Sequence, residues 1–241
     1  WGKPKIVVVG SLHQFHESIF KSVYSIRHLR AMIKHIHPDV VFMEFPPDWE
    51  AKYPEVSKIP DIFMERRDAI IPLKHDLGFE LMGMEYTTLI EEKVQEYKKL
   101  VSDISPLIPG ERGKYLKEVY LSVEKAIGGG ECLMQLVDRK IASNPVELMT
   151  ASEPILELTH ESERILYFKG NPEKDAWAEY HRIHLEKFRE VFKLDKYQNK
   201  TILLIWGLDH AYYWNRLLKT EDTVDYLPGE EAFRGIDWTK I

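Results

Sequence analysis

The stretch Lys5-Ile-Val-Val-Val-Gly-Ser-Leu-His13 contains the first element from which the fold can be predicted. Its run of β-branched residues is typical of a strand that is buried on both faces of a parallel sheet. Gly10 ends the run, since glycine lets the backbone turn sharply. Apolar residues then recur at helical spacing from Glu17 to about His37, where a proline follows and stops the helix. Asp39–Met43 reads as a second strand, so these segments predict a right-handed β-α-β unit with parallel strands.

The rest of the chain continues to alternate between strands and helices. The further expected elements are a helix at about 61–76 and strands at 79–84 and 201–206. Only helical patterns occur from about residue 87 to 196, which places a helical insertion before the last strand. The tail from Asp222 has little periodicity and is expected to wrap over the surface. The sequence thus predicts one α/β domain over residues 1–241, with a central, mostly parallel or mixed sheet flanked by helices.

Composition limits the classes of protein that the chain can belong to. The 241 residues are 44% hydrophobic and 30% charged, and the net charge is −6. This balance argues against global disorder, and the mild acidity gives no reason to expect a nucleic-acid partner. Cys132 is the only cysteine, so an internal disulfide and a CxxC zinc site are excluded.

No apolar run approaches the roughly 20 residues that a membrane-spanning helix needs, so no transmembrane segment is expected. The chain begins at Trp1 rather than Met, and a leader or a membrane anchor could therefore have preceded it. The sequence leaves the localisation and the oligomeric state open.

Polar residues follow each of the four predicted strands. They are His13 in Gly10-Ser-Leu-His13, Glu44, Glu85, and His210 in Gly207-Leu-Asp-His210. Ligands of open α/β sheets bind beyond the carboxyl ends of the strands, so parallel neighbouring strands would bring these residues to one edge. Taken alone, each is more often a loop residue or a solvated charge, but four at equivalent positions favour a site. Imidazole and carboxylate groups can hold a divalent metal that activates water, or can perform acid–base chemistry directly.

The order of these motifs resembles that of a known group of proteins. Gly10-Ser-Leu-His13, Pro38-Asp-Val-Val-Phe-Met-Glu44, Gly83-Met-Glu85-Tyr-Thr and Gly207-Leu-Asp-His210 look like the ordered motifs of the TraB/Tiki/GumN superfamily. Erythromycin esterases and the haem-iron protein ChaN are more distant relatives of that group. The resemblance covers roughly residues 5–218 and is carried by short motifs at strand ends. Because Tiki-like members are described as metal-dependent proteases, it implies a hydrolase acting on a peptide or a small-molecule ester.

The resemblance also implies roles for individual residues. A suspected divalent metal, Mn²⁺, Co²⁺ or Zn²⁺, would have three ligands: His13, Glu44 and His210. Glu85 would be a general base for water or a further ligand, and His13 could itself take part in the catalysis. The family pattern places an arginine on the long helix before the last strand, where Arg182 would stabilise negative charge on the substrate. Arg189 is the alternative.

Two other hypotheses use the same edge of the sheet. In a metal-free, esterase-like route, His13 would deprotonate water while Glu44 orients it. In a second hypothesis the chain is a non-catalytic binding or regulatory protein, related to haem or pheromone binding.

Four residues near these motifs are less specific. Asp209 could orient His210 or ligate a metal, although helix capping explains it equally well. His16 could line the site, whereas His181 and His184 read as ordinary polar positions on a helix.

Overall fold

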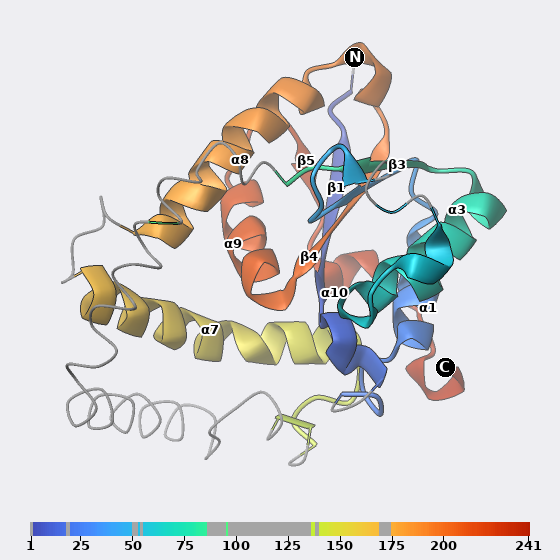
Figure 1. Ribbon diagram of the computed structural model, residues 1–241, viewed down its shortest axis with the longest axis horizontal. Helices are drawn as coiled ribbons and strands as arrows, with labels where there is room; N and C mark the ends of the chain where they lie inside the picture. Colours follow the sequence, from blue (N-terminus) through green and yellow to red (C-terminus); the bar gives the residue numbers. More distant parts are fainter. Residues whose placement is uncertain are drawn as a thin grey trace.

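A five-stranded parallel sheet forms the centre of the structure, a computed structural model (Figure 1). The structure describes residues 2–17, 20–49, 53, 55–85, 95, 136–137, 140–168 and 175–241. The strand order is β3-β2-β4-β1-β5. The strands are β1 (Lys5–Ser11), β2 (Val40–Met43), β3 (Glu80–Gly83), β4 (Thr201–Gly207) and β5 (Asp225–Tyr226).

The four strands expected from the sequence lie in this one sheet, and the predicted α/β class is confirmed. β5 corrects the expectation for the tail, because residues 225 and 226 pair in parallel with Lys5 and Ile6. A strand of two residues is too short to produce a recognisable pattern. The expected helical insertion therefore precedes β4, which is not the last strand. Much of that insertion, including Cys132, lies outside the described residues.

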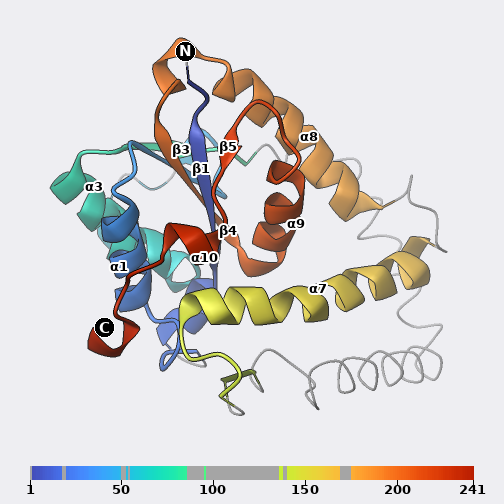
Figure 2. The same ribbon diagram turned by 180° about the vertical axis from the view of Figure 1, so that it is seen from behind.

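Helices cover both faces of the sheet (Figures 1 and 2). The helices on one face are α1 (Ile26–Ile36), α3 (Ile71–Leu77) and α10 (Gly229–Ala232), and those on the other are α8 (Ala176–Phe192) and α9 (Leu208–Leu218). Successive side chains of β1 point to opposite faces: Val7 and Val9 belong to the core beneath α1, and Ile6 and Val8 to the core beneath α8 and α9. Burial on both faces explains why the strand is apolar throughout.

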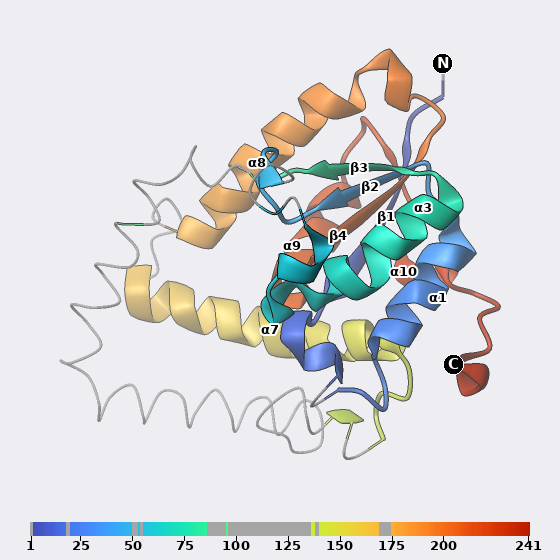
Figure 3. The ribbon, with the colours of Figure 1, turned by 45° about the vertical axis from the view of Figure 1, so that its right-hand side comes forward.

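A further helix, α7 (Pro145–Phe168), crosses the carboxyl ends of the strands (Figures 1 and 3). Its side chains Leu148 and Ile155 join the same core as α1. Among the helices of the described residues, none combines the length and the apolar character needed to cross a membrane.

The first helix begins later than its apolar spacing suggests. A 3-10 helix at His13–Glu17 and a turn occupy the start of the predicted segment, and α1 begins only after Ser25. The backbone N–H of Ser25 donates a hydrogen bond to Nδ1 of His28 at 3.1 Å, which fixes the helix start. The helix ends at His37 in the left-handed conformation, immediately before Pro38.

The helix predicted at 61–76 is interrupted by a π-helical segment, Arg66–Ile70, before α3 begins. Pro72 has no N–H with which to bond the carbonyl of Asp68 four residues earlier. That carbonyl instead accepts a hydrogen bond from the guanidinium of Arg30 at 3.0 Å. Such π-helical turns are common near functional sites, and Glu65 directly precedes this one.

Candidate functional site

The connections of two neighbouring strands leave in opposite directions at the carboxyl edge of the sheet, and the candidate site at this point is called the crevice. β1 and β4 pair along their whole length, from Lys5 with Thr201 to Ser11 with Gly207. The chain leaves β1 towards α1 on one face, and leaves β4 into α9 on the other. In open α/β sheets this reversal is the position at which ligands bind.

Gly207, at the end of β4, lies where residues from three elements meet. A methyl group on its Cα would lie 3.1 Å from Nε2 of His13, 3.1 Å from Oδ1 of Asp209 and 3.3 Å from Oε2 of Glu44. The backbone N–H of Gly207 donates a hydrogen bond to the same Glu44 oxygen at 2.7 Å. The missing side chain therefore leaves a small space lined by an imidazole and two carboxyl groups.

His13 is oriented by a buried carboxylate. Its φ is +49°, in the left-handed region that non-glycine residues rarely adopt, and its backbone N–H donates to Oγ of Ser11. Its Nδ1 lies 2.9 Å from Oε1 of Glu65, whose side chain is 2% exposed, against 34% for His13. Burial alone would lower the pKa of His13, but the hydrogen bond and charge of Glu65, with the charges of Glu44 and Asp209, raise it overall. His13 thus presents Nε2 to the crevice.

Glu44 carries a proton at neutral pH. Burial is the largest cause and raises its pKa to about 8, with the negative charges of Asp209 and Glu85 adding to the effect. The hydrogen bond from Gly207 and the charge of His13 oppose this rise. Glu85, the residue that follows β3, is therefore near enough to act electrostatically on Glu44.

His210 connects Glu44 to the interior of the protein. Its Nε2 lies 3.3 Å from Oε1 of Glu44, and its Nδ1 lies 3.0 Å from Nε2 of His181, which is 0% exposed. Burial, with the neighbouring histidines, lowers the pKa of His210 to about 3, so it is neutral. The two groups are thus in polar contact, and a neutral His210 does not form an ion pair with Glu44. In this state Glu44 can donate to Nε2, and Nδ1–H can donate to His181.

The histidines and arginine of α8 differ from the sequence expectation. His181 and His184, which read as ordinary polar positions, are fully buried. Arg182 is 55% exposed and pairs with Glu179 and Glu186 of the same helix at 2.7 and 2.6 Å. Helix phase turns Arg182 towards solvent, and its expected role in the site stays a prediction.

The alternative arginine, Arg189, pairs with Glu221 at 2.7 Å. His16 is buried and hydrogen-bonds within its own loop: its Nδ1 lies 2.9 Å from the carbonyl of Tyr24, and its Nε2 accepts from the N–H of Leu12. His16 therefore fixes the loop that carries His13. Sequence reasoning missed Glu65, which follows no strand and belongs to no motif.

The three expected metal ligands, His13, Glu44 and His210, come from different elements that meet at the carboxyl edge of the sheet. Among the described residues, no group of three or more His, Cys, Asp or Glu side chains is arranged to hold a metal ion. Nε2 of His210 lies 3.3 Å from Oε1 of Glu44, and its Nδ1 lies 3.0 Å from Nε2 of His181. We therefore derive no step through a metal, and the metal dependence expected from the sequence stays a prediction.

The fold and the site define a parallel α/β protein with a His/Glu crevice at the point where the connections reverse. Comparisons of the chain with models of protein families, with curated proteins and with solved structures gave no match. The resemblance to the TraB/Tiki/GumN superfamily therefore stays a prediction.

Proposed function

We propose that this chain is a hydrolase of peptide or ester bonds in which His13 is the general base. The observation that carries the proposal is the pairing of His13 with the buried Glu65 at 2.9 Å, which leaves Nε2 directed at the crevice. A carboxylate in this position fixes the tautomer and stabilises the imidazolium that forms when His13 accepts a proton. The hydrogen bond and the charge of Glu65 raise the pKa of His13, which makes it a stronger base.

Glu44 supplies the complementary acid. Water attacks the carbonyl carbon and gives its proton to Nε2 of His13, and Glu44 donates its own proton to the leaving oxygen or nitrogen. A pKa of about 8 keeps that proton available at neutral pH. Asp209, whose Oδ1 lines the same space beside Gly207, can accept a hydrogen bond from the substrate or the water.

The proposal is tested with graded 4-nitrophenyl esters and fluorogenic peptides. We expect His13→Gln to lower kcat/KM by about 100-fold or more, the usual contribution of a general base. The control is His75→Gln, because His75 is exposed on α3. Each assay is repeated after exhaustive chelation, and then with added Mn²⁺, Co²⁺ or Zn²⁺.

Activity that survives chelation supports the acid–base route. Activity lost on chelation and restored by a metal would instead establish the metal-dependent route. A folded protein that binds a haem or a peptide at this crevice without turnover would favour the binding-protein hypothesis.

A further inference from the structure

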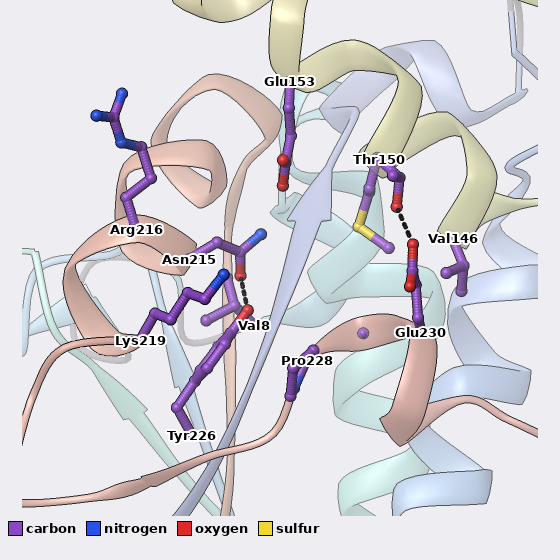
Figure 4. Close-up of a pocket in the computed structure, with 12 residues that line it drawn as sticks. Val8, Val146, Thr150, Glu153, Asn215, Arg216, Lys219, Tyr226, Pro228 and Glu230 are labelled. Carbon is purple, nitrogen blue, oxygen red and sulfur yellow. Dashed lines mark hydrogen bonds between the residues drawn. The ribbon is translucent and has the colours of Figure 1, made fainter.

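A second concave region lies away from the His/Glu crevice and shares none of its residues (Figure 4). It is a cavity of about 270 Å³ between α7, α9 and the segment that joins β5 to α10. Apolar groups of Val8, Val146 and Pro228 form part of its wall. Because drug-sized ligands occupy roughly 300–1,000 Å³, a ligand here would be smaller.

Side chains of opposite charge line this cavity. Figure 4 shows Glu153 reaching into it from α7 and Lys219 from α9. The two side chains act on each other electrostatically, since the charge of Lys219 lowers the pKa of Glu153. Arg216 points away and is held by Glu157 at 3.2 Å and by the hydroxyl of Tyr212 at 2.6 Å. Lys219 is therefore the cation that is directed at the cavity.

A second carboxylate lies on the opposite wall. Glu230 accepts a long hydrogen bond of 3.4 Å from the hydroxyl of Thr150, which leaves most of its acceptor capacity unused. Burial is the largest cause of a raised pKa at Glu153. The charges of Lys219 and Arg216 oppose the rise, and the charge of Glu230 adds to it. Two carboxylates that line one cavity and act on each other electrostatically favour a cation between them.

We propose that this cavity binds a free α-amino acid with an apolar side chain. The ammonium group would lie between Glu153 and Glu230, and the carboxylate would bind Lys219 and the amide of Asn215. The side chain would contact the apolar wall. A zwitterion meets both signs of charge in one small molecule, which neither a simple cation nor a simple anion does. The proposal does not rest on the hydrolase activity.

The test is titration calorimetry of the whole chain with L-leucine, leucinamide, N-acetyl-leucine and 4-methylpentanoate. We expect L-leucine to bind, and each analogue, which lacks one charge, to bind at least about tenfold more weakly. That factor follows from the loss of one hydrogen bond between charged groups. Leucinamide binding as tightly as leucine would show a cation site only. Equal binding of 4-methylpentanoate would show an anion site only, and either result overturns the proposal.

Two variants and two controls assign the binding to this cavity. Glu153→Gln and Lys219→Met should each weaken leucine binding at least about tenfold. Glu161→Gln, further along α7, and Lys193→Met, an exposed lysine after α8, should leave it unchanged. Circular dichroism confirms that each variant is folded. If L-leucine gives no heat or thermal shift at about 10 mM, or if the two cavity variants bind like wild type, the proposal is wrong.

Discussion

At the scale of single residues, the site depends on the absence of a side chain at Gly207. Its φ of −51° and ψ of 148° are open to any residue, so the backbone does not require glycine. The requirement comes from His13, Asp209 and Glu44, whose polar atoms approach the position where a Cβ would lie. A residue that is neutral for the fold can thus be decisive for the site.

Gly207→Ala should therefore lower activity more than stability. The added methyl group would lie 3.1 Å from Nε2 of His13, so that imidazole must move and kcat/KM should fall about tenfold or more. Gly78→Ala is the opposite control, because φ is +74° there and no atom lies within 4 Å of the added group. It should lower the free energy of unfolding by about 1 kcal/mol and leave kcat/KM unchanged. Equal activities for the two variants would contradict the crowding at Gly207.

The buried proton of Glu44 should appear in the pH dependence of stability. Since burial raises its pKa from 4.5 to about 8, the folded state holds a proton that the unfolded state releases above pH 4.5. The free energy of unfolding should then fall as the pH rises from about 5 to 8. Glu44→Gln keeps a donor towards His210 but cannot ionise. The free energy of unfolding of this variant should therefore fall less between about pH 5 and 8 than that of the wild type. Parallel curves from urea denaturation of the two proteins would contradict a raised pKa.

At the scale of elements, the sequence predicted strands better than helix ends and helix faces. β1 and β4 are apolar throughout because both faces are buried, and that pattern is visible in one dimension. The start of α1 depends on a cap formed by Ser25 and His28, which apolar spacing does not encode. β5 depends on pairing with β1 rather than on its own residues.

In the candidate site too, local sequence patterns predicted some residues, while others are placed only by contacts between distant segments. His13, Glu44 and His210 were predicted as a group because each follows a strand, and parallel strands end at one edge. Glu65 reaches His13 from a helical segment 52 residues away, and no local pattern marks such a contact. In α8, the sequence indicated Arg182 rather than the adjacent His181 as the residue of the site. Only packing decides which residue of a helix faces inwards, and the sequence alone does not show it.

Helix α8 therefore gives a direct comparison between adjacent residues. His181→Leu removes the ring nitrogen that lies 3.0 Å from Nδ1 of His210 and leaves Nδ1 buried without this partner. The loss should lower kcat about tenfold, because His210 is then held less firmly beside Glu44. Arg182→Ala removes only exposed ion pairs within the helix, so activity and stability should stay close to wild type. Activity measured beside the thermal midpoint separates the two cases. Loss of kcat in Arg182→Ala, with His181→Leu unaffected, would restore the role expected from the sequence.

At the scale of the whole molecule, the site exists only when distant segments are brought together. His13 follows β1, Glu44 follows β2 and Gly207 ends β4, while Glu65 comes from the helical segment that leads into α3 (Figure 3). The sheet order places β4 between β2 and β1, so residues from the first fifth and the last fifth of the chain share one crevice. A base and an acid thereby meet at one place. Burial raises the pKa of Glu44, whereas at His13 burial lowers the pKa and the carboxyl groups of Glu65, Glu44 and Asp209 raise it overall.

The pH dependence of catalysis reports on both groups at once. Turnover in the proposed mechanism needs His13 without its proton and Glu44 with its proton, so kcat/KM should follow a bell-shaped curve. The acid limb should lie above pH 6.5, because Glu65 raises the pKa of His13, and the alkaline limb should lie near pH 8. Glu65→Gln should move the acid limb to lower pH, and Glu44→Gln should remove the alkaline limb while lowering the maximum. If a metal-bound water with a pKa of about 7 were the nucleophile, the profile would still have an acid limb, but Glu65→Gln and Glu44→Gln would not change it in these ways. A profile that neither variant changes would exclude His13 and Glu44 as the base and the acid.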